Sequence, residues 1–138
     1  MIIKSGRPIE DSDISPKMAQ RSPKKKTLEK DIQREICDWL YSQGTFFWRN
    51  NNTPIFQPGG NGRAGRFRAM PKYSVKGLPD IMCISHGRFI GLEVKVPGYW
   101  KRTDAQIDVK DKFIDNGAYY SLVTSLQEAQ DYFKGINK

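Results

Sequence analysis

Two short apolar runs, residues 81–84 and 89–96, lie on either side of the dipeptide His86-Gly87. Runs of this length around a turn dipeptide are typical of a β-hairpin. If the turn has two residues, Ser85 pairs with Arg88, and this pairing sets the register of both strands. The sequence therefore predicts an antiparallel hairpin with a defined register.

Continuing the same pairing places Asp80 opposite Glu93, with side chains ~5 Å apart at their Cβ atoms. Two like charges at such a distance are destabilising unless something offsets them, and a divalent cation would. Side chains alternate along a strand, so Lys95 shares the face of Glu93, while Leu92, Val94 and Val96 point to the other face. The hairpin thus predicts two carboxylates and an ammonium group together.

This cluster has a catalytic and a structural interpretation. Carboxylate oxygens are the ligands that Mg²⁺ and Mn²⁺ prefer, and a bound ion can activate water for attack on a phosphodiester. Lys95 could orient that water or neutralise charge on the phosphate. Alternatively, Asp80 only starts a strand, and Glu93 and Lys95 form the solvated side of an edge strand.

The flanking segments show helix and strand patterns. Apolar residues recur at helical spacing from residue 28 to 40, Thr27 can cap that helix, and Gly44 can stop it. Thr103-Gln106 and Ser125-Glu128 have capping-box spacing. The expected order is αβββαβα, an α/β fold with a mixed sheet flanked by helices: helix 27–43, strand 45–49, the hairpin, helix 103–116, strand 118–123 and helix 125–135.

A length of 138 residues fits one compact domain plus a tail. Residues 1–26 contain prolines and a lysine run but no apolar periodicity, which predicts a flexible basic arm before a domain at 27–138. Residues 50–76 are rich in Gly, Pro and Asn, which predicts a long loop without regular structure. Cys37 and Cys83 are expected to be buried free thiols, and Trp48 is expected in the core.

A net charge of +8 favours a polyanionic partner, with nucleic acid ahead of an acidic membrane surface. No apolar run could cross a bilayer or serve as a signal core, so we expect a soluble, cytoplasmic protein. Residues 41–79 contain no Asp or Glu and lead directly into Asp80. The expected DNA contacts are the cations of this stretch, with two more beyond Lys95 that could equally be a solvated helix start: Arg49, Arg63, Arg66, Arg68, Lys72 and Lys76, then Lys101 and Arg102.

The segment KGLPD at residues 76–80, followed by EVK at residues 93–95, resembles the PD-(D/E)XK nuclease superfamily. The closer resemblance is to VRR-NUC domains, which also carry an early Glu on the first helix and a Gln on the helix after the ExK strand. Here these would be Glu29 and Gln106. The resemblance spans about residues 27 to 130, although the Val-Arg-Arg stretch is replaced by Gly65-Arg66-Phe67-Arg68.

The resemblance implies a restriction-endonuclease-like αβββαβ core and a Mg²⁺ or Mn²⁺ site. Asp80 and Glu93 would be metal ligands together with the backbone carbonyl of Val94, and Glu29 would support the ion directly or through a water. Lys95 and Gln106 would complete the catalytic set. Glu29 can also be explained as an acid at the start of a helix, and Gln106 as half of a capping box.

The resemblance further implies a structure-selective endonuclease that acts as a homodimer on branched DNA such as Holliday junctions, in a phage or mobile element. Flap, nicking or restriction-like cleavage stays open. A non-catalytic DNA-binding module and an RNA-directed protein are the alternatives of other kinds.

Overall fold

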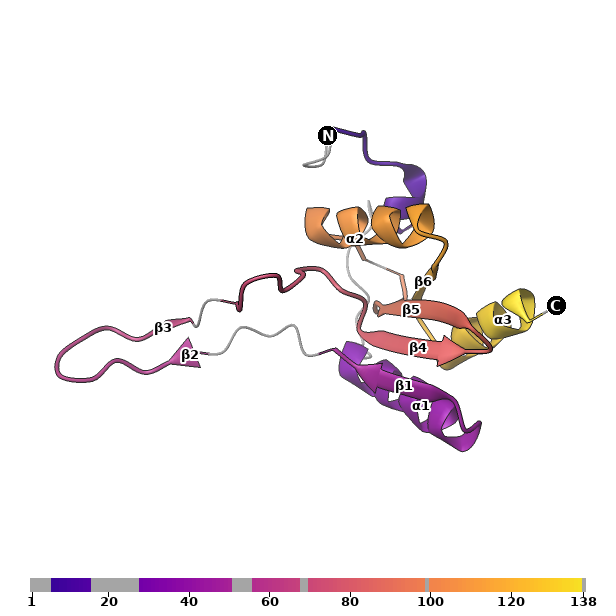
Figure 1. The fold of residues 1–138 in the computed structure, drawn as a ribbon, viewed down its shortest axis with the longest axis horizontal. Helices are drawn as coiled ribbons and strands as arrows, with labels where there is room; N and C mark the ends of the chain where they lie inside the picture. Colours follow the sequence, from indigo (N-terminus) through magenta and orange to yellow (C-terminus); the bar gives the residue numbers. More distant parts are fainter. Residues whose placement is uncertain (1–5, 16–27, 51–55, 68–69, 99, 138) are drawn as a thin grey trace.

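The structure, a computed structural model, describes residues 6–15, 28–50, 56–67, 70–98 and 100–137. In this part of the chain, a mixed four-stranded sheet is flanked by helices (Figure 1). Helices α1 (Glu29–Ser42) and α3 (Leu126–Ile136) pack on one face of the sheet, and α2 (Asp104–Asp115) lies on the other. The predicted α/β class and mixed sheet are confirmed.

The strand order in the sheet is β1-β4-β5-β6. Strands β1 (Phe46–Arg49), β4 (Ile81–Ser85) and β5 (Arg88–Val94) are antiparallel neighbours, and β6 (Tyr119–Val123) is parallel to β5 because α2 makes the crossover between them. Ser85 pairs with Arg88, and the pairing continues to Ile81 opposite Leu92. His86 and Gly87 both have positive φ, as a two-residue hairpin turn requires. The predicted register is therefore confirmed.

The main core lies between the sheet and the pair of helices α1 and α3. Every fourth residue of α1 from Ile32 to Leu40 is buried there, against alternate residues of β4 and β5. The buried residues of this core are Ile32, Ile36, Leu40, Ile81, Cys83, Ile90, Leu92, Val94, Val123, Ala129 and Phe133. Cys37 and Cys83 are both free thiols; Cys83 is buried and Cys37 half-buried.

The helix ends follow the sequence signals closely. Gly44 has φ of 70° just after α1, and Thr103 and Ser125 cap α2 and α3 by accepting hydrogen bonds from the third residue of each helix. The second capping box differs from the expectation, because the Glu128 carboxylate accepts from Thr124 rather than from Ser125. The expected cap at Thr27 lies outside the described residues.

The long loop contains regular structure, so the expectation of none was wrong. Strands β2 (Phe56–Gln57) and β3 (Arg66–Phe67) form a small antiparallel hairpin that projects from the sheet (Figure 1). The rings of Phe56 and Phe67 meet edge to face at 5.5 Å. This ring contact explains how a Gly- and Pro-rich stretch can pair.

Residues 6–15 also differ from the flexible arm expected for residues 1–26. They include a 3-10 helix (Asp11–Asp13) and bridge to the start of α2 through Ile14 and Lys101. Ion pairs hold this segment in place, because Asp13 is fully buried and pairs with Arg102 and Lys110. The other residues of the expected arm lie outside the described part of the chain.

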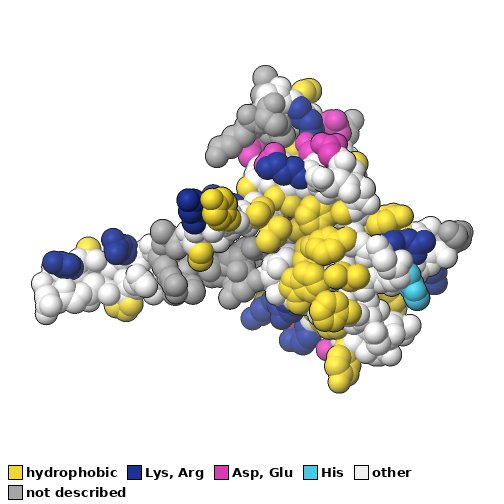
Figure 2. Space-filling model, viewed as in Figure 1, with side chains coloured by type: hydrophobic (Ala, Val, Ile, Leu, Met, Phe, Trp, Pro, Cys, Tyr) yellow, Lys and Arg dark blue, Asp and Glu magenta, His cyan; other side chains and the backbone are white. Residues whose placement is uncertain are grey.

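Part of the α2 side of the sheet is left uncovered by the helix. Hydrophobic side chains gather there over β1, β4 and β5 (Figure 2). We call Phe46, Trp48, Ile84 and Phe89 the open aromatic face; all four are exposed. The expectation that Trp48 lies in the core was wrong: it is exposed, because α2 packs mainly over β6 and, through Phe113, over Gly91 of β5.

Among the described residues, no helix is both long enough and apolar enough to cross a membrane.

Candidate active site

The segment Gly77–Asp80 is held tightly between α2 and β5. Gly77 has φ of 88°, and a Cβ atom there would lie 2.5 Å from the backbone carbon of Ala105, so only glycine fits. Pro79 packs over Gly91, where a Cβ would come within 2.6 Å of the proline ring. These two close approaches fix where Asp80 begins β4.

Asn50 anchors the same segment from the other side. Its backbone N–H donates to the Asp80 carbonyl at 2.9 Å, and its Nδ2 donates to the Pro79 carbonyl at 2.7 Å. Asn50 was not among the site residues predicted from the sequence. The only signal for Asn50 in the sequence was its position directly after β1. Because β1 pairs with β4 and Arg49 lies opposite Ile81, the residue that follows β1 comes beside Asp80.

The side chains of Asp80 and Glu93 meet, as the predicted register requires. Asp80 Oδ2 accepts the backbone N–H of Val94 at 2.8 Å, one residue beyond Glu93. The Glu93 side chain is 2% exposed, and its Oε1 accepts a hydrogen bond from Gln106 Nε2 at 2.7 Å. Its other oxygen, Oε2, is buried and accepts no hydrogen bond from a donor among the described residues. The two carboxyl groups lie close enough for one, when protonated, to donate to the other.

Lys95 and Gln106 complete the cluster. The Lys95 Nζ lies 3.2 Å from Gln106 Oε1 and 3.9 Å from Glu93 Oε1. Gln106 Oε1 also accepts the Thr103 N–H at 2.8 Å, which closes the capping box at the start of α2. The two interpretations of Gln106 thus combine: one side chain caps the helix and reaches the acid and the lysine.

Burial dominates the electrostatics of the pair. Burial, followed by the negative charge of Asp80, raises the pKa of Glu93 to about 9, and Lys95 acts in the opposite direction. Burial also raises the pKa of Asp80, although hydrogen bonds from the Val94 N–H and the Glu93 carboxyl group, and the charges of Lys95 and Arg49, lower it. Without a bound cation, Glu93 therefore holds a proton at neutral pH.

Glu29 begins α1 and is linked to the same cluster. Loss of surrounding water raises its pKa, Lys95 lowers it, and Asp80 raises it. Arg49 extends from β1 towards the same helix and donates to Gln33 at 2.8 Å. Glu29 and Arg49 therefore lie near the acid pair, because Glu29 feels the charges of Asp80 and Lys95, and Asp80 feels the charge of Arg49.

The residues fit a hard divalent ion that keeps water ligands. Within the described residues no group of three or more His, Cys, Asp or Glu side chains could hold a metal ion by itself. Mg²⁺ usually binds through one or two carboxylates together with waters and substrate phosphate, so it does not need such a cage. Glu93 Oε2, which is buried and lacks a donor within the described ranges, is the atom that a cation would contact. The role of the Val94 carbonyl stays a prediction.

Most of the expected DNA-binding cations are exposed. In the described parts of the chain these are Arg49, Arg63, Arg66, Lys72, Lys76 and Lys101. Arg68 lies outside the described residues. Arg102 was assigned wrongly to the DNA-binding surface: it is 6% exposed, and its Nη1 lies 3.3 Å from Asp13 Oδ1. Because a buried, paired guanidinium cannot meet a phosphate, the basic rim beyond Lys95 is reduced to Lys101.

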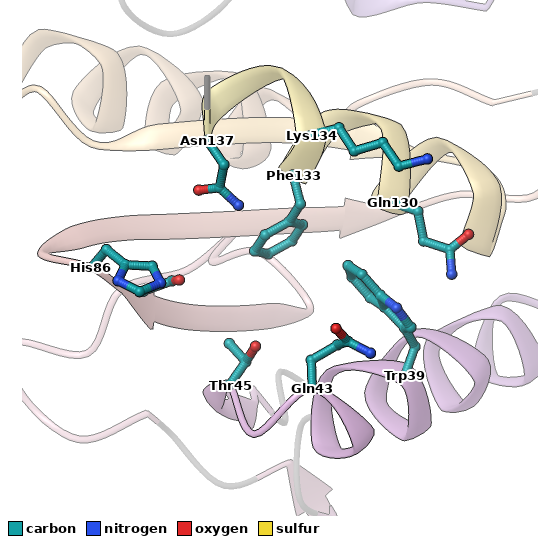
Figure 3. Close-up of a pocket in the computed structure, with 9 residues that line it drawn as sticks. Trp39, Gln43, Thr45, His86, Gln130, Phe133, Lys134 and Asn137 are labelled. Atoms are coloured by element: carbon teal, nitrogen blue, oxygen red, sulfur yellow. The ribbon is translucent and has the colours of Figure 1, made fainter.

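A separate hollow of about 790 Å³ lies at the other end of the hairpin, beside the β4–β5 turn (Figure 3). Trp39, Phe133 and Lys134 contribute to its wall from α1 and α3, and His86 from the turn. His86 is exposed there, as expected for a turn residue. This hollow is a full strand length from Asp80 and is not part of the acid cluster.

No family model matches this chain, and neither the curated proteins nor the solved structures contain a significant match to it.

Proposed function

We propose that the protein is an intracellular, divalent-metal-dependent DNA endonuclease with a restriction-endonuclease-like core. Asp80 and Glu93 would hold Mg²⁺ or Mn²⁺, with the Val94 carbonyl as a further ligand and Glu29 acting through a water. The observation that supports this most is the buried Glu93 carboxyl group, which contacts a second acid, lies near a lysine, and has one oxygen without a donor among the described residues. Two acids in contact at a buried site cannot both be charged unless a cation lies with them.

The proposed reaction is hydrolysis of a phosphodiester, in which a water oxygen bonds to phosphorus and one phosphorus–oxygen bond to a sugar breaks. A bound Mg²⁺ would polarise the phosphate and lower the pKa of a coordinated water. Lys95 is placed to orient the attacking water or to neutralise charge on the phosphate oxygens. Gln106 holds Lys95 and Glu93 in register, since it bonds to both.

DNA is the proposed substrate because the side chains that lead to the acids are cationic. Arg63 and Arg66 lie on the projecting β2–β3 hairpin, while Lys76 directly precedes the Gly77–Asp80 segment. Cations along such a path can contact phosphates on both sides of a cut. Branched DNA is the favoured substrate by resemblance to VRR-NUC nucleases.

The protein would act as a homodimer, since a symmetric pair of sites can cut two strands of a branch. The open aromatic face is the proposed contact between the copies. Its four side chains are 36% to 65% exposed, and the strand positions between them on this side of the sheet carry no charge. Two chains of net charge +8 can therefore meet there without bringing like charges together.

The experiment is a cleavage assay on labelled junction, flap, nicked, single-stranded and linear DNA and on RNA, with Mg²⁺ or Mn²⁺ added separately. Asp80→Asn and Lys95→Ala should reduce cleavage by about 100-fold or more. The matched controls Asp108→Asn and Lys112→Ala, an exposed pair on α2, should cleave like the wild type.

Equal activity of the wild type and Asp80→Asn on every substrate would overturn the enzyme proposal. Salt-sensitive DNA binding by both proteins would then identify a non-catalytic binding module. A preference for RNA in the same panel would redirect the substrate class and leave the metal site standing.

A further inference from the structure

The N-terminal segment 6–15 is fastened to the connection between β5 and α2. Ser15 Oγ donates to the Gly98 carbonyl at 2.7 Å and accepts the Trp100 N–H at 3.3 Å. The Ser15 N–H donates to the Trp100 carbonyl at 3.2 Å, and the Arg102 N–H donates to the Asp13 carbonyl at 3.3 Å. The segment therefore pairs with the stretch that links Lys95 to the first turn of α2.

Asp13 is the centre of this contact. It has no exposed surface, and its Oδ1 lies 2.7 Å from Lys110 Nζ and 3.3 Å from Arg102 Nη1. Its Oδ2 lies 3.1 Å from Arg7 Nη2, and Arg7 also reaches Asp111 at 2.9 Å. One carboxylate thus meets three cations, two of which are themselves buried.

The two buried cations lie on either side of Gln106 in the sequence. Arg102 directly precedes Thr103, the cap of α2. Lys110 follows Gln106 by four residues, so Gln106 and Lys110 lie on the same face of the helix. The Arg102 guanidinium also lies over the ring of Tyr120, 5.6 Å from its centroid. Contacts to Asp13 therefore fix both the start and the second turn of α2.

We propose that residues 6–15 form a clasp and that Asp13 is a positioning residue, which holds the first turn of α2 where Gln106 can reach Glu93 and Lys95. This inference rests on the proposed function for its effect on cleavage. Its structural content, the placement of Gln106, can be measured without any activity.

An ionic clasp suits positioning better than it suits stability. Burying a carboxylate with three cations has a large desolvation cost, so apolar side chains could have fastened the segment at least as firmly. Charged hydrogen bonds are directional, however, and Asp13 fixes two points of α2 relative to one backbone segment. A displacement of about 1 Å at such a point is enough to impair a site that depends on alignment.

The test uses the full chain and the variants Asp13→Asn and Ser15→Ala. Ser15→Ala removes two hydrogen bonds of the clasp and leaves every buried charge paired, so it keeps the test open should Asp13→Asn fail to fold. Asp108→Asn, an exposed acid on the same helix, is the matched control. The measurements are the side-chain amide signals of Gln106 by ¹⁵N NMR, its amide exchange rate, and kcat and KM for cleavage.

We expect both clasp variants to shift the Gln106 amide signals, to speed their exchange, and to lower kcat about 10- to 100-fold with little change in KM. The proposal is overturned if folded variants are less stable to heat but keep wild-type Gln106 signals and kcat. If the wild type cleaves nothing, the proposed function fails, and the Gln106 signals still decide whether the clasp positions α2.

Discussion

Glu93 combines two properties that seldom occur together on a strand: almost complete burial and an oxygen that accepts no hydrogen bond from any donor in the described part of the chain. Gln106 lies over this side chain on the α2 side of the sheet and donates to its Oε1, which helps to explain the burial. A charged carboxylate in such surroundings is unstable unless a cation accompanies it. The protonation state of Glu93 should therefore show whether a cation is bound at the site.

The pH dependence of stability follows from the raised pKa of Glu93. The pKa of Glu93 rises from about 4.3 in the unfolded chain to about 9 in the fold. Between these values the folded protein binds more protons than the unfolded one, so the free energy of unfolding falls as pH rises. The raised pKa of Asp80 acts in the same direction.

We predict that metal-free wild type loses at least about 1 kcal/mol more of its unfolding free energy between about pH 5 and pH 8 than Glu93→Gln does. The substitution keeps the shape of the protonated acid, so the variant should be about as stable as the wild type at the acidic end. Urea unfolding in the presence of a chelator measures both quantities. Glu35→Gln, exposed on α1, should follow the wild type, and a parallel pH profile for Glu93→Gln would contradict the assignment.

At the level of elements, the sequence predicted what periodicity and turn chemistry control. The β4–β5 register, the cap of α2 and the glycine stop of α1 were all predictable, because each depends on residues close together in the chain. The register alone also placed Asp80 beside Glu93. These local rules were enough to predict the acid cluster.

Contacts between distant polar residues were not predictable in this way. Nothing in the spacing of Asp13 and Arg102 indicates that they meet, so residues 6–15 looked like a free arm and Arg102 like a DNA contact. The position of Trp48 depends on how far α2 extends across the sheet, which is a tertiary property. Asn50 became recognisable only through the β1–β4 pairing.

Gly77 offers a test of how α2 and the Asp80 segment fit together. Gly77→Ala combines a left-handed backbone with a collision against Ala105, and it should cost about 2–4 kcal/mol of unfolding free energy. Gly117→Ala has a similar φ but open space around it, so it should cost only about 1–2 kcal/mol. Chemical denaturation compares the two directly.

Gly135→Ala serves as the control for adding a methyl group. It lies inside α3 with no atom near the new Cβ, and it should stabilise the protein by about 0.5–1 kcal/mol. Equal costs for the Gly77 and Gly117 variants would show that the close approach to α2 does not hold the Asp80 segment.

At the scale of the whole molecule, charge and apolar surface are separated. Cations occupy the β2–β3 hairpin and the residues that lead to Asp80, whereas the open aromatic face over β1, β4 and β5 carries none (Figure 2). A basic path next to an uncharged apolar face is what a DNA-binding homodimer would use. The two surfaces can therefore be tested separately.

We predict that Trp48→Glu weakens self-association by about 100-fold or more, because the contact would bury an unpaired charge. Sedimentation equilibrium over a range of protein concentrations measures the effect. Tyr41→Glu, an exposed aromatic position at the end of α1 and outside the open aromatic face, should leave the association unchanged. A wild type that is monomeric at every concentration would contradict the proposed dimer while leaving the acid pair untouched.

The central claim is that Asp80 and Glu93 share one divalent ion, and anomalous diffraction from crystals soaked in Mn²⁺ tests it most directly. We predict one strong anomalous peak within ligand distance of both carboxylates, in contact with Glu93 Oε2, and no such peak in crystals of Asp80→Asn treated in the same way. A wild-type crystal that diffracts well but shows no manganese between residues 80 and 93 would contradict the account.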